Sequence, residues 1–305
     1  MESIRRRALT VSVALLGALL CPNAAHAEPP SGKGEHRIEW TYRHFQPWEY
    51  SMVIGVSVTA AYVEATRTSF APHSEWRGVL FDDGARSSLV AKSSEGRARA
   101  ATISNYLWHA TQWYPVVVDS LLFPLVFDKG NTETAAQMVL IDWQAQSTAF
   151  FLLRIGAHVV GRQRPALTGC ESDSGYDATC DPKSTNRYVS FPAGHPTMAF
   201  SGAGLVCAHH LALPVYGSDA AGWAACGVAL GSATVTGLLR IVADKHWTTD
   251  VMIGSLIGFG SGFGLPYFLH YGPHLRANVA GEKLDFAVMP TAGDALAGIS
   301  FVALQ

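Results

Sequence analysis

The sequence predicts an all-α fold, a bundle of about six helices followed by a short C-terminal β-hairpin. Of the 305 residues, 49% are hydrophobic, which is enough to bury one large core. These residues gather in six long apolar segments with helical character, and only the end of the chain has a pattern typical of strands. The net charge of −2 offers no basic excess for gripping nucleic acid, so we expect no nucleic-acid partner.

The N-terminus has the pattern of a secretory signal peptide. Three arginines at positions 5–7 precede an apolar run over residues 8–20, and AHA at positions 25–27 resembles a cleavage site. We predict that residues 1–27 are removed, that the mature protein is exported, and that residues 28–47 form a polar and aromatic leader. The alternative is a retained anchor, but the apolar run is short for a full membrane span.

The predicted helices belong to one domain, residues 48–272. A polar, arginine-containing stretch at residues 66–99 separates the first two helices. In the tail, residues 273–305, apolar residues alternate around Pro290 and Gly293 from residue 284 onward, which predicts the hairpin. The six helical segments cover residues 48–65, 100–127, 135–160, 197–213, 223–242 and 248–271.

Whether these helices cross a membrane is left open by the sequence. The last three are only weakly hydrophilic, which favours a membrane-embedded bundle. If export places residue 28 outside and the next three helices all span, however, the loop after Val160 would lie in the cytoplasm. A surface position for the first helix, or a soluble bundle, would avoid this. Charged and titratable side chains inside the helices would also be costly in a bilayer: Asp119, Asp142, Arg154, His158, His209 and His210.

Cysteine usage agrees with export. Cys170 and Cys180 bracket a polar loop whose length allows closure, so we expect a disulfide there, with two free thiols as the alternative. Cys207 and Cys226 lie in apolar helical segments, where we expect them to be small core residues.

Three short motifs carry the chemistry. They are GRQRP at residues 161–165, PAGH at 192–195 and RIVADKHWTTD at 240–250. Together and in this order they resemble the signature of the type 2 phosphatidic acid phosphatase (PAP2) superfamily, which also contains vanadium haloperoxidases. Three motifs in the right order are far more specific than any one alone. The resemblance covers residues 104–270 and implies a PAP2-like helical bundle.

The chain departs from the family pattern at three positions. The family has a lysine seven residues before the first-motif arginine, a serine in the second motif and a serine before the third-motif arginine. This chain has Ala157, Ala193 and Leu239 there. Two phosphate ligands, the lysine and the second-motif serine, are therefore missing.

The resemblance implies three catalytic residues. His246 would be the nucleophile that forms a phosphohistidine. Asp250 would accept the other imidazole N–H and fix the tautomer. His195 would protonate the leaving group and then activate water. Without the other motifs, His246 and Asp250 would be read as an ordinary polar pair four residues apart on a helix.

The same resemblance implies the groups that hold the phosphate. Arg164 and Arg240 would clamp its oxygens, and Gly194 would allow backbone approach at a helix N-terminus. Arg154, one turn before Ala157, is the preferred substitute for the lost lysine. Its alternative is a pair with Asp142 or a solvent-exposed position. Arg162, Lys183, Arg187 and Lys245 are further candidates.

We therefore expect an exported, metal-independent phosphatase acting on a phosphomonoester or diphosphate, with a lipid substrate if the bundle is membrane-embedded. A phosphotransferase would use the same intermediate. The alternatives are a degenerate lipid-phosphate binder and a vanadate-dependent haloperoxidase, which the missing ligands disfavour. We expect no cofactor and no metal ligands; His158, His209 and His210 are interpreted as structural.

Overall fold

The computed structural model describes residues 38–70, 74, 76–272, 275–279, 282–293 and 296–304, and its side chains are described over residues 38–66, 74 and 76–272. The chain divides into two compact units, Met1–Glu35 and His36–Gln305, and every described residue belongs to the second. The predicted signal peptide lies outside the described residues.

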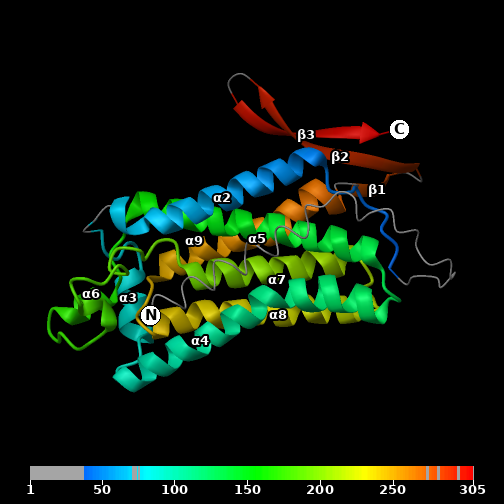
Figure 1. Cartoon of the computed structure of the whole chain (residues 1–305). Helices are drawn as coiled ribbons and strands as arrows, with labels where there is room; N and C mark the ends of the chain where they lie inside the picture. The colour runs from blue at the N-terminus through cyan, green and yellow to red at the C-terminus, as the bar shows by residue number, and fades with distance from the viewer. Residues whose placement is uncertain are drawn as a thin grey trace. The chain divides into compact units, whose positions relative to one another are not determined.

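The described core of the chain is helical, as the sequence predicts, and all six predicted helices are present (Figure 1). Two short helices, α3 and α6, were not predicted because they are brief, and α3 is also largely polar. The order is α2 (Pro47–Phe70), α3 (Asp82–Leu89), α4 (Ser94–Tyr114) continued by the π-helical η2 (Pro115–Phe127), α5 (Thr132–Val160), α6 (Ala166–Cys170), η3 (Ala178–Cys180), α7 (Gly194–Ala212), α8 (Asp219–Val242) and α9 (Thr248–Phe259), extended by η4 (Gly260–Gly264) and η5 (Tyr267–Tyr271).

Local sequence explains where several helices begin and end. The side chains of Ser93, Asn131 and Ser218 each accept a backbone N–H in the first turn of α4, α5 and α8. Such caps satisfy donors that the helix itself leaves unpaired. Gly161 ends α5 in the left-handed conformation, with φ of 58°.

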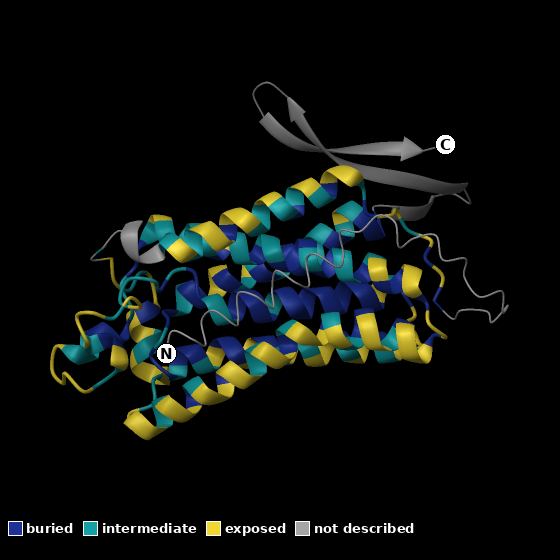
Figure 2. Cartoon of the chain, viewed as in Figure 1, coloured by how far each residue is buried: buried dark blue, intermediate teal, exposed yellow. Residues whose placement is uncertain are grey.

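Helix α7 lies at the centre of the bundle, and α4, α5, α8 and α9 all pack against it. Figure 2 shows α7 dark blue along nearly its whole length, between outer helices with exposed faces. Its neighbours approach closely because glycines stand at the contacts. A Cβ atom added at Gly258 of α9 would lie 2.1 Å from the carbonyl oxygen of Thr197 in α7. A side chain at that position would force the two helices apart.

The end of the predicted leader belongs to the core. Ile38, Trp40 and Phe45 are buried and pack in one cluster with Met138 and Ile141 of α5. The aromatic residues of this segment therefore close the bundle instead of forming a separate leader.

Among the described residues, three helical stretches are long and apolar enough to cross a membrane: Ser94–Phe127, Asp219–Val242 and Thr248–Tyr271. Two buried carboxylates of the bundle have hydrogen-bond partners. Asp142 accepts hydrogen bonds from His209 (2.8 Å) and Ser120 (2.6 Å). Asp119 accepts one from the hydroxyl of Tyr216 (2.6 Å). Pairing of this kind is the condition under which apolar surroundings tolerate such groups.

Two disulfides lie within the described part of the chain. Cys170–Cys180 closes the predicted loop, with Cα atoms 5.4 Å apart. Cys207–Cys226 joins α7 to α8, with Cα atoms 4.5 Å apart. Both cysteines are buried in the core, as expected, but their bond to each other was not predicted. Their apolar surroundings gave no sign that the packing of α7 against α8 places them face to face.

The tail contains a three-stranded antiparallel sheet in the order β1 (Leu275–Val279), β2 (Glu282–Gly293) and β3 (Leu296–Leu304). The predicted hairpin corresponds to β2 and β3, and β1 extends it. Pro290 pairs in register with Ile299 across the two longer strands.

We expect the Gly258→Ala variant to be destabilised by about 1–3 kcal/mol, because overpacking at a helix contact forces the backbone to move. Gly231→Ala in α8 is the matched control, since a Cβ there meets no atom within 4 Å. This control should be neutral or gain up to about 1 kcal/mol from the higher helix propensity of alanine. Thermal unfolding of the purified variants measures both, and equal melting temperatures would contradict the packing argument.

Candidate active site

The three motifs meet at one end of the helices, the end at which α3 and α6 lie (Figure 1). Arg164 follows the C-terminus of α5, and His195 lies in the first turn of α7. Arg240 is in the last turn of α8, and His246 lies in the loop just before α9. We call Arg164, His195, Arg240 and His246 the basic cluster.

His246 is oriented by the backbone. Its ring is 4% exposed, and Nδ1 lies 2.7 Å from the carbonyl oxygen of Ser190. A carbonyl only accepts, so Nδ1 carries the proton and Nε2 keeps its lone pair. Burial, followed by the charges of Arg164 and Arg240, holds the pKa of His246 well below its usual value near 6.5. The result is a neutral imidazole with a free basic nitrogen, as a nucleophile requires.

Arg240 is a buried cation whose contacts are neutral. It is 5% exposed, and Nη1 donates to Ser104 Oγ (3.3 Å) and Asn105 Oδ1 (3.4 Å) of α4. Within the part of the chain that the structure describes, its Nε has no hydrogen-bond partner. A desolvated guanidinium that ends on neutral groups is poised to take an anion.

His195 shares this environment. Its Nε2 lies 2.8 Å from Asn105 Oδ1, and its ring lies 4.4 Å from that of Trp108. Burial and then the charges of Arg240 and Arg164 lower the pKa of His195 to about 2. Both arginines therefore act electrostatically on both histidines, so the four groups lie near one another.

Gly194 is the first residue of α7, and Ala193 before it provides no side-chain cap. A Cβ at Gly194 would meet Leu153 at 3.4 Å, an ordinary contact, so packing alone does not demand a glycine here. The N-terminus of α7 contributes positive potential beside His195.

Asp250 does not bind His246 as expected. One of its oxygens accepts from Arg162 Nη1 (2.6 Å), and the other accepts from Ser190 Oγ (2.6 Å) and the backbone N–H of Trp247 (2.9 Å). The physical reason is that α9 begins after His246, so the two residues are not on one helical face. Asp250 is the third residue of α9 and caps its own helix.

Arg154, the predicted substitute for the lost lysine, is held elsewhere. Its Nη1 forms an ion pair with Glu64 of α2 at 3.0 Å, and its guanidinium lies 4.8 Å from the ring of Phe150. Asp142, its alternative partner, binds His209 instead. The position of Arg154 gives no support to a phosphate contact.

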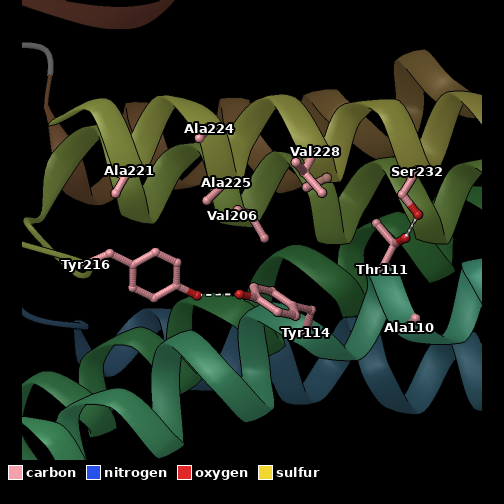
Figure 3. Close-up of a pocket in the computed structure, with 11 residues that line it drawn as sticks. Ala110, Thr111, Tyr114, Val206, Tyr216, Ala221, Ala224, Ala225, Val228 and Ser232 are labelled. Carbon is pink, nitrogen blue, oxygen red and sulfur yellow. Dashed lines mark hydrogen bonds between the residues drawn. The ribbon is translucent and has the colours of Figure 1, made fainter. Parts of the chain in front are cut away.

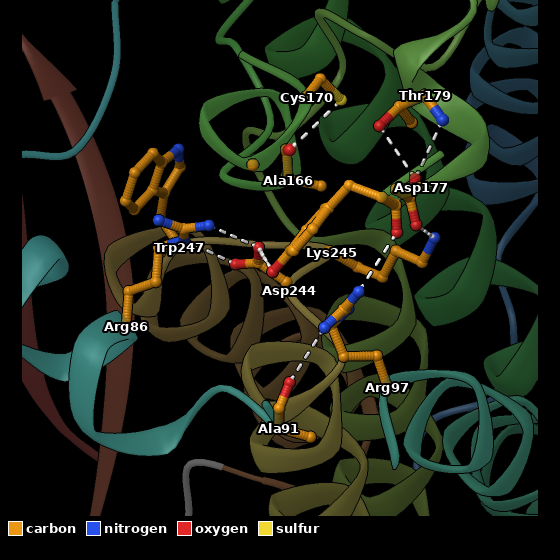
Figure 4. Close-up of polar contacts among 12 residues, drawn as sticks. Arg86, Ala91, Arg97, Ala166, Cys170, Asp177, Thr179, Asp244, Lys245 and Trp247 are labelled. Carbon is orange, nitrogen blue, oxygen red and sulfur yellow. Dashed lines mark hydrogen bonds and ion pairs between the residues drawn. The ribbon is translucent and has the colours of Figure 1, made fainter. Parts of the chain in front are cut away.

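The loop closed by Cys170–Cys180 contacts the segment that leads into His246, and Figure 4 shows Asp177 of the loop beside Lys245 of that segment. Tyr176 donates to Asp244 (2.9 Å), which also receives two bonds from Arg86. Lys245, a further predicted phosphate contact, pairs with Asp177 of this loop. The loop therefore holds the segment that leads into His246. Lys245 of that segment is already paired with a carboxylate. Arg187 is likewise engaged, donating to the carbonyls of Thr179 and Cys180.

A cavity of about 450 Å³ lies between α4, α7 and α8 (Figure 3). Its walls are mainly alanine and valine. At one end of the cavity, a hydrogen bond between Thr111 and Ser232 (2.6 Å) joins α4 to α8. At the other end, the hydroxyls of Tyr114 and Tyr216 form a hydrogen bond. None of the basic cluster lines this cavity, so it is separate from the candidate site.

Sequence reasoning missed Ser104, Asn105 and Ser190. The first two lie in α4, far from every motif along the chain, and no spacing rule connects them with Arg240. Ser190 stands two residues before the PAGH motif, and its place directly upstream was the one signal available.

Comparison with known proteins finds similarity in the segment that contains the three motifs. The model of the PAP2 superfamily matches residues 145–272, a range that includes all three motifs. A lipid A 1-phosphatase from Porphyromonas gingivalis is 28% identical over 130 residues, which are 43% of this chain and 23% of that protein. The chain thus aligns with about a quarter of the relative's length. No solved structure matches the chain significantly.

The buried neutral histidines predict a stability that falls in acid. Both have a pKa below the unfolded value near 6.5, so under acidic conditions the unfolded chain binds protons that the folded chain does not. Stability should therefore decrease as the pH drops below about 6.5, by up to about 1.4 kcal/mol per pH unit for each histidine. Urea unfolding of His246→Gln between pH 8 and pH 5 should show a shallower decline than wild type; parallel curves would contradict this.

Proposed function

The chain belongs to the PAP2 superfamily, and we propose that it is a metal-independent phosphatase that hydrolyses a phosphomonoester or diphosphate, with a lipid phosphate as substrate. The observation that carries the proposal is the buried Arg240. Together with Arg164 it gives the site two positive charges beside two neutral histidines. A phosphoryl group supplies the oxygens and negative charge that such a site lacks.

The protonation of His246 at Nδ1 leaves Nε2 as the attacking atom. Nε2 of His246 attacks phosphorus, the bond to the leaving oxygen breaks, and a phosphohistidine forms while Nδ1–H stays on the Ser190 carbonyl. Arg164 and Arg240 neutralise the phosphoryl oxygens. A bound phosphate also offsets their effect on His195, which raises the pKa of His195 and lets it protonate the leaving oxygen. His195 then takes a proton from the water that hydrolyses the phosphohistidine.

A lipid substrate and an extracytoplasmic site are the finer parts of the proposal. Three helical stretches have the length and composition of membrane spans. The Porphyromonas gingivalis relative is a lipid A 1-phosphatase. The disulfide beside the basic cluster is stable in an oxidising compartment, which supports export.

A non-catalytic lipid-phosphate binder is the second candidate, and a specific observation favours it. Ala157 and Ala193 are both buried where the family has phosphate ligands. Arg154, Lys245 and Arg187 are each held by other groups. This candidate predicts lipid-phosphate binding with no turnover.

The His246→Ala variant decides between the two. Phosphate release should be measured with chelator and no added metal, on lipid phosphates, a prenyl diphosphate and a soluble monoester. We expect the variant to lose about a thousandfold or more of the wild-type rate, because removal of a nucleophile leaves only background catalysis. His44→Ala, an exposed histidine outside the cluster, should keep the full rate. Binding of lipid phosphate by a wild-type protein that releases nothing would establish the binder instead.

Ala193→Ser restores the second-motif serine. At the position before α7, the hydroxyl accepts a first-turn N–H, worth about 1 kcal/mol, and donates to phosphate. We expect a higher melting temperature and an unchanged or raised kcat/KM on the best substrate. A large loss of activity would mean that the buried site is packed around alanine.

A further inference from the structure

We propose that Asp250 acts on the nucleophile indirectly, through Ser190, and that Ser190, Arg162 and Asp82 are positioning residues for the reaction. The inference rests on the proposed function and names the groups that hold His246 in place. It replaces the expected direct bond between Asp250 and His246 with a relay of four buried residues.

Ser190 is the middle of the relay. It is fully buried, and three of its groups are bonded at once. Its carbonyl accepts Nδ1–H of His246 (2.7 Å), its N–H donates to the Arg162 carbonyl (3.0 Å), and its hydroxyl donates to Asp250 (2.6 Å). Because the hydroxyl and N–H are both tied, the carbonyl direction is fixed, and with it the plane of the imidazole ring.

Arg162 fixes Asp250. Its guanidinium has no exposed surface and bridges two carboxylates, Asp250 at 2.6 Å and Asp82 at 2.7 Å. It also donates to the Arg77 carbonyl through Nε (3.0 Å) and Nη2 (2.7 Å), and the rings of Trp76 and Trp247 lie 4.8 and 5.6 Å from it. This is a fully bonded cation and not the phosphate contact considered from the sequence.

Asp82 is the last residue of the relay, on the far side of Arg162 from Asp250. It lies at the start of α3, and its oxygens accept from the N–H of Thr249 (2.9 Å) and the hydroxyl of Thr249 (2.7 Å). Backbone and side-chain hydrogen bonds stabilise its charged form and lower the pKa of Asp82 despite burial. Asp82 therefore ties α3 to the first turn of α9, next to Asp250.

Charge gives the relay a chemical role beyond rigidity. Asp82, Asp250 and Arg162 carry a net charge of −1 when both carboxyls are ionised, and they lie on the side of His246 that carries Nδ1–H. Burial raises the pKa of Asp250, while the charge of Arg162 and the hydrogen bond from Ser190 act in the opposite direction. Arg164, Arg240 and His195 face the ring as the cationic or neutral groups of the basic cluster. Phosphorylation at Nε2 makes the ring an imidazolium, and a carbonyl acceptor backed by negative charge stabilises that cation.

A double-mutant cycle on kcat tests the relay. Ser190→Ala keeps the carbonyl and removes the hydroxyl, and Asp250→Asn removes the charge. We expect each change alone to lower kcat about tenfold, equivalent to about 1.4 kcal/mol, with little change in KM. The double variant should be no slower than the slower single variant. If Asp250→Asn costs the same factor with and without the Ser190 hydroxyl, Asp250 acts independently of Ser190 and the proposal is overturned.

Ser201→Ala is the matched control, since Ser201 is also a fully buried serine but lies outside the relay. It should keep the wild-type kcat. Asp82→Asn is a second route that leaves Ser190 and Asp250 intact, and it should lower kcat at constant KM. Wild-type rates in Asp82→Asn, with its fold confirmed by its melting temperature, would confine Asp82 to a structural role and overturn that part of the proposal.

An activity-free readout separates this proposal from the proposed function. In nitrogen-15 histidine spectra, the Nδ1–H signal of His246, assigned with His246→Ala, should shift or broaden in Ser190→Ala and stay in place in Ser201→Ala. If wild type releases no phosphate, the proposed function fails while this signal still tests the relay. An unmoved signal in Ser190→Ala would overturn the relay even in an active enzyme.

Discussion

The ion pair of Arg162 with Asp82 and Asp250 is the interaction on which the rest of the site depends. Two buried carboxylates cannot remain charged in a dry interior without a cation between them, and one guanidinium serves both. Through it, the short helix α3, the end of α5 and the start of α9 are held at one point. Residues from distant parts of the chain thereby meet at one end of the bundle.

A second constraint is the closeness of the helices around α7. Backbones that approach within van der Waals distance at Gly202, Gly258 and Gly262 leave no room for sliding. The N-terminus of α7 carries His195, so the position of this histidine relative to Arg240 is set by backbone contacts along the length of the helix. A catalytic group on a helix buried over nearly its whole length can be placed more precisely than one on a loop.

The sequence predicted the helices well, because they depend on local pattern. Apolar segments gave the six long helices to within a few residues at most ends. The order of the motifs pointed to Arg164, His195, Arg240 and His246, and the roles of these four residues stay predictions. The predicted side-chain partners of Asp250 and Arg154 were wrong. Asp250 and Arg154 found partners that lie far away along the chain, and no spacing rule encodes such contacts.

The same limit explains the cysteines. Cys170 and Cys180 were recognisable because a short polar loop joins them, whereas Cys207 and Cys226 belong to different helices and meet only through tertiary packing. Asn105 is similar, since its two contacts, to His195 and Arg240, exist only once α4 lies against α7 and α8. Contacts between side chains on different helices are the part of a site that is hardest to predict from a single sequence.

The two disulfides lie in different chemical settings. Cys170–Cys180 is in a surface loop, where small thiols of the surroundings can exchange with it, so its state follows the redox potential outside the protein. Cys207–Cys226 is enclosed between α7 and α8, with exposed fractions of 1% and 7%, and is shielded from such exchange once the helices have packed. The inner bridge has to form while the helices are still assembling. The oxidation state of Cys170–Cys180 therefore depends on the compartment in which the protein resides. The oxidation state of Cys207–Cys226 depends on the conditions under which the protein folded.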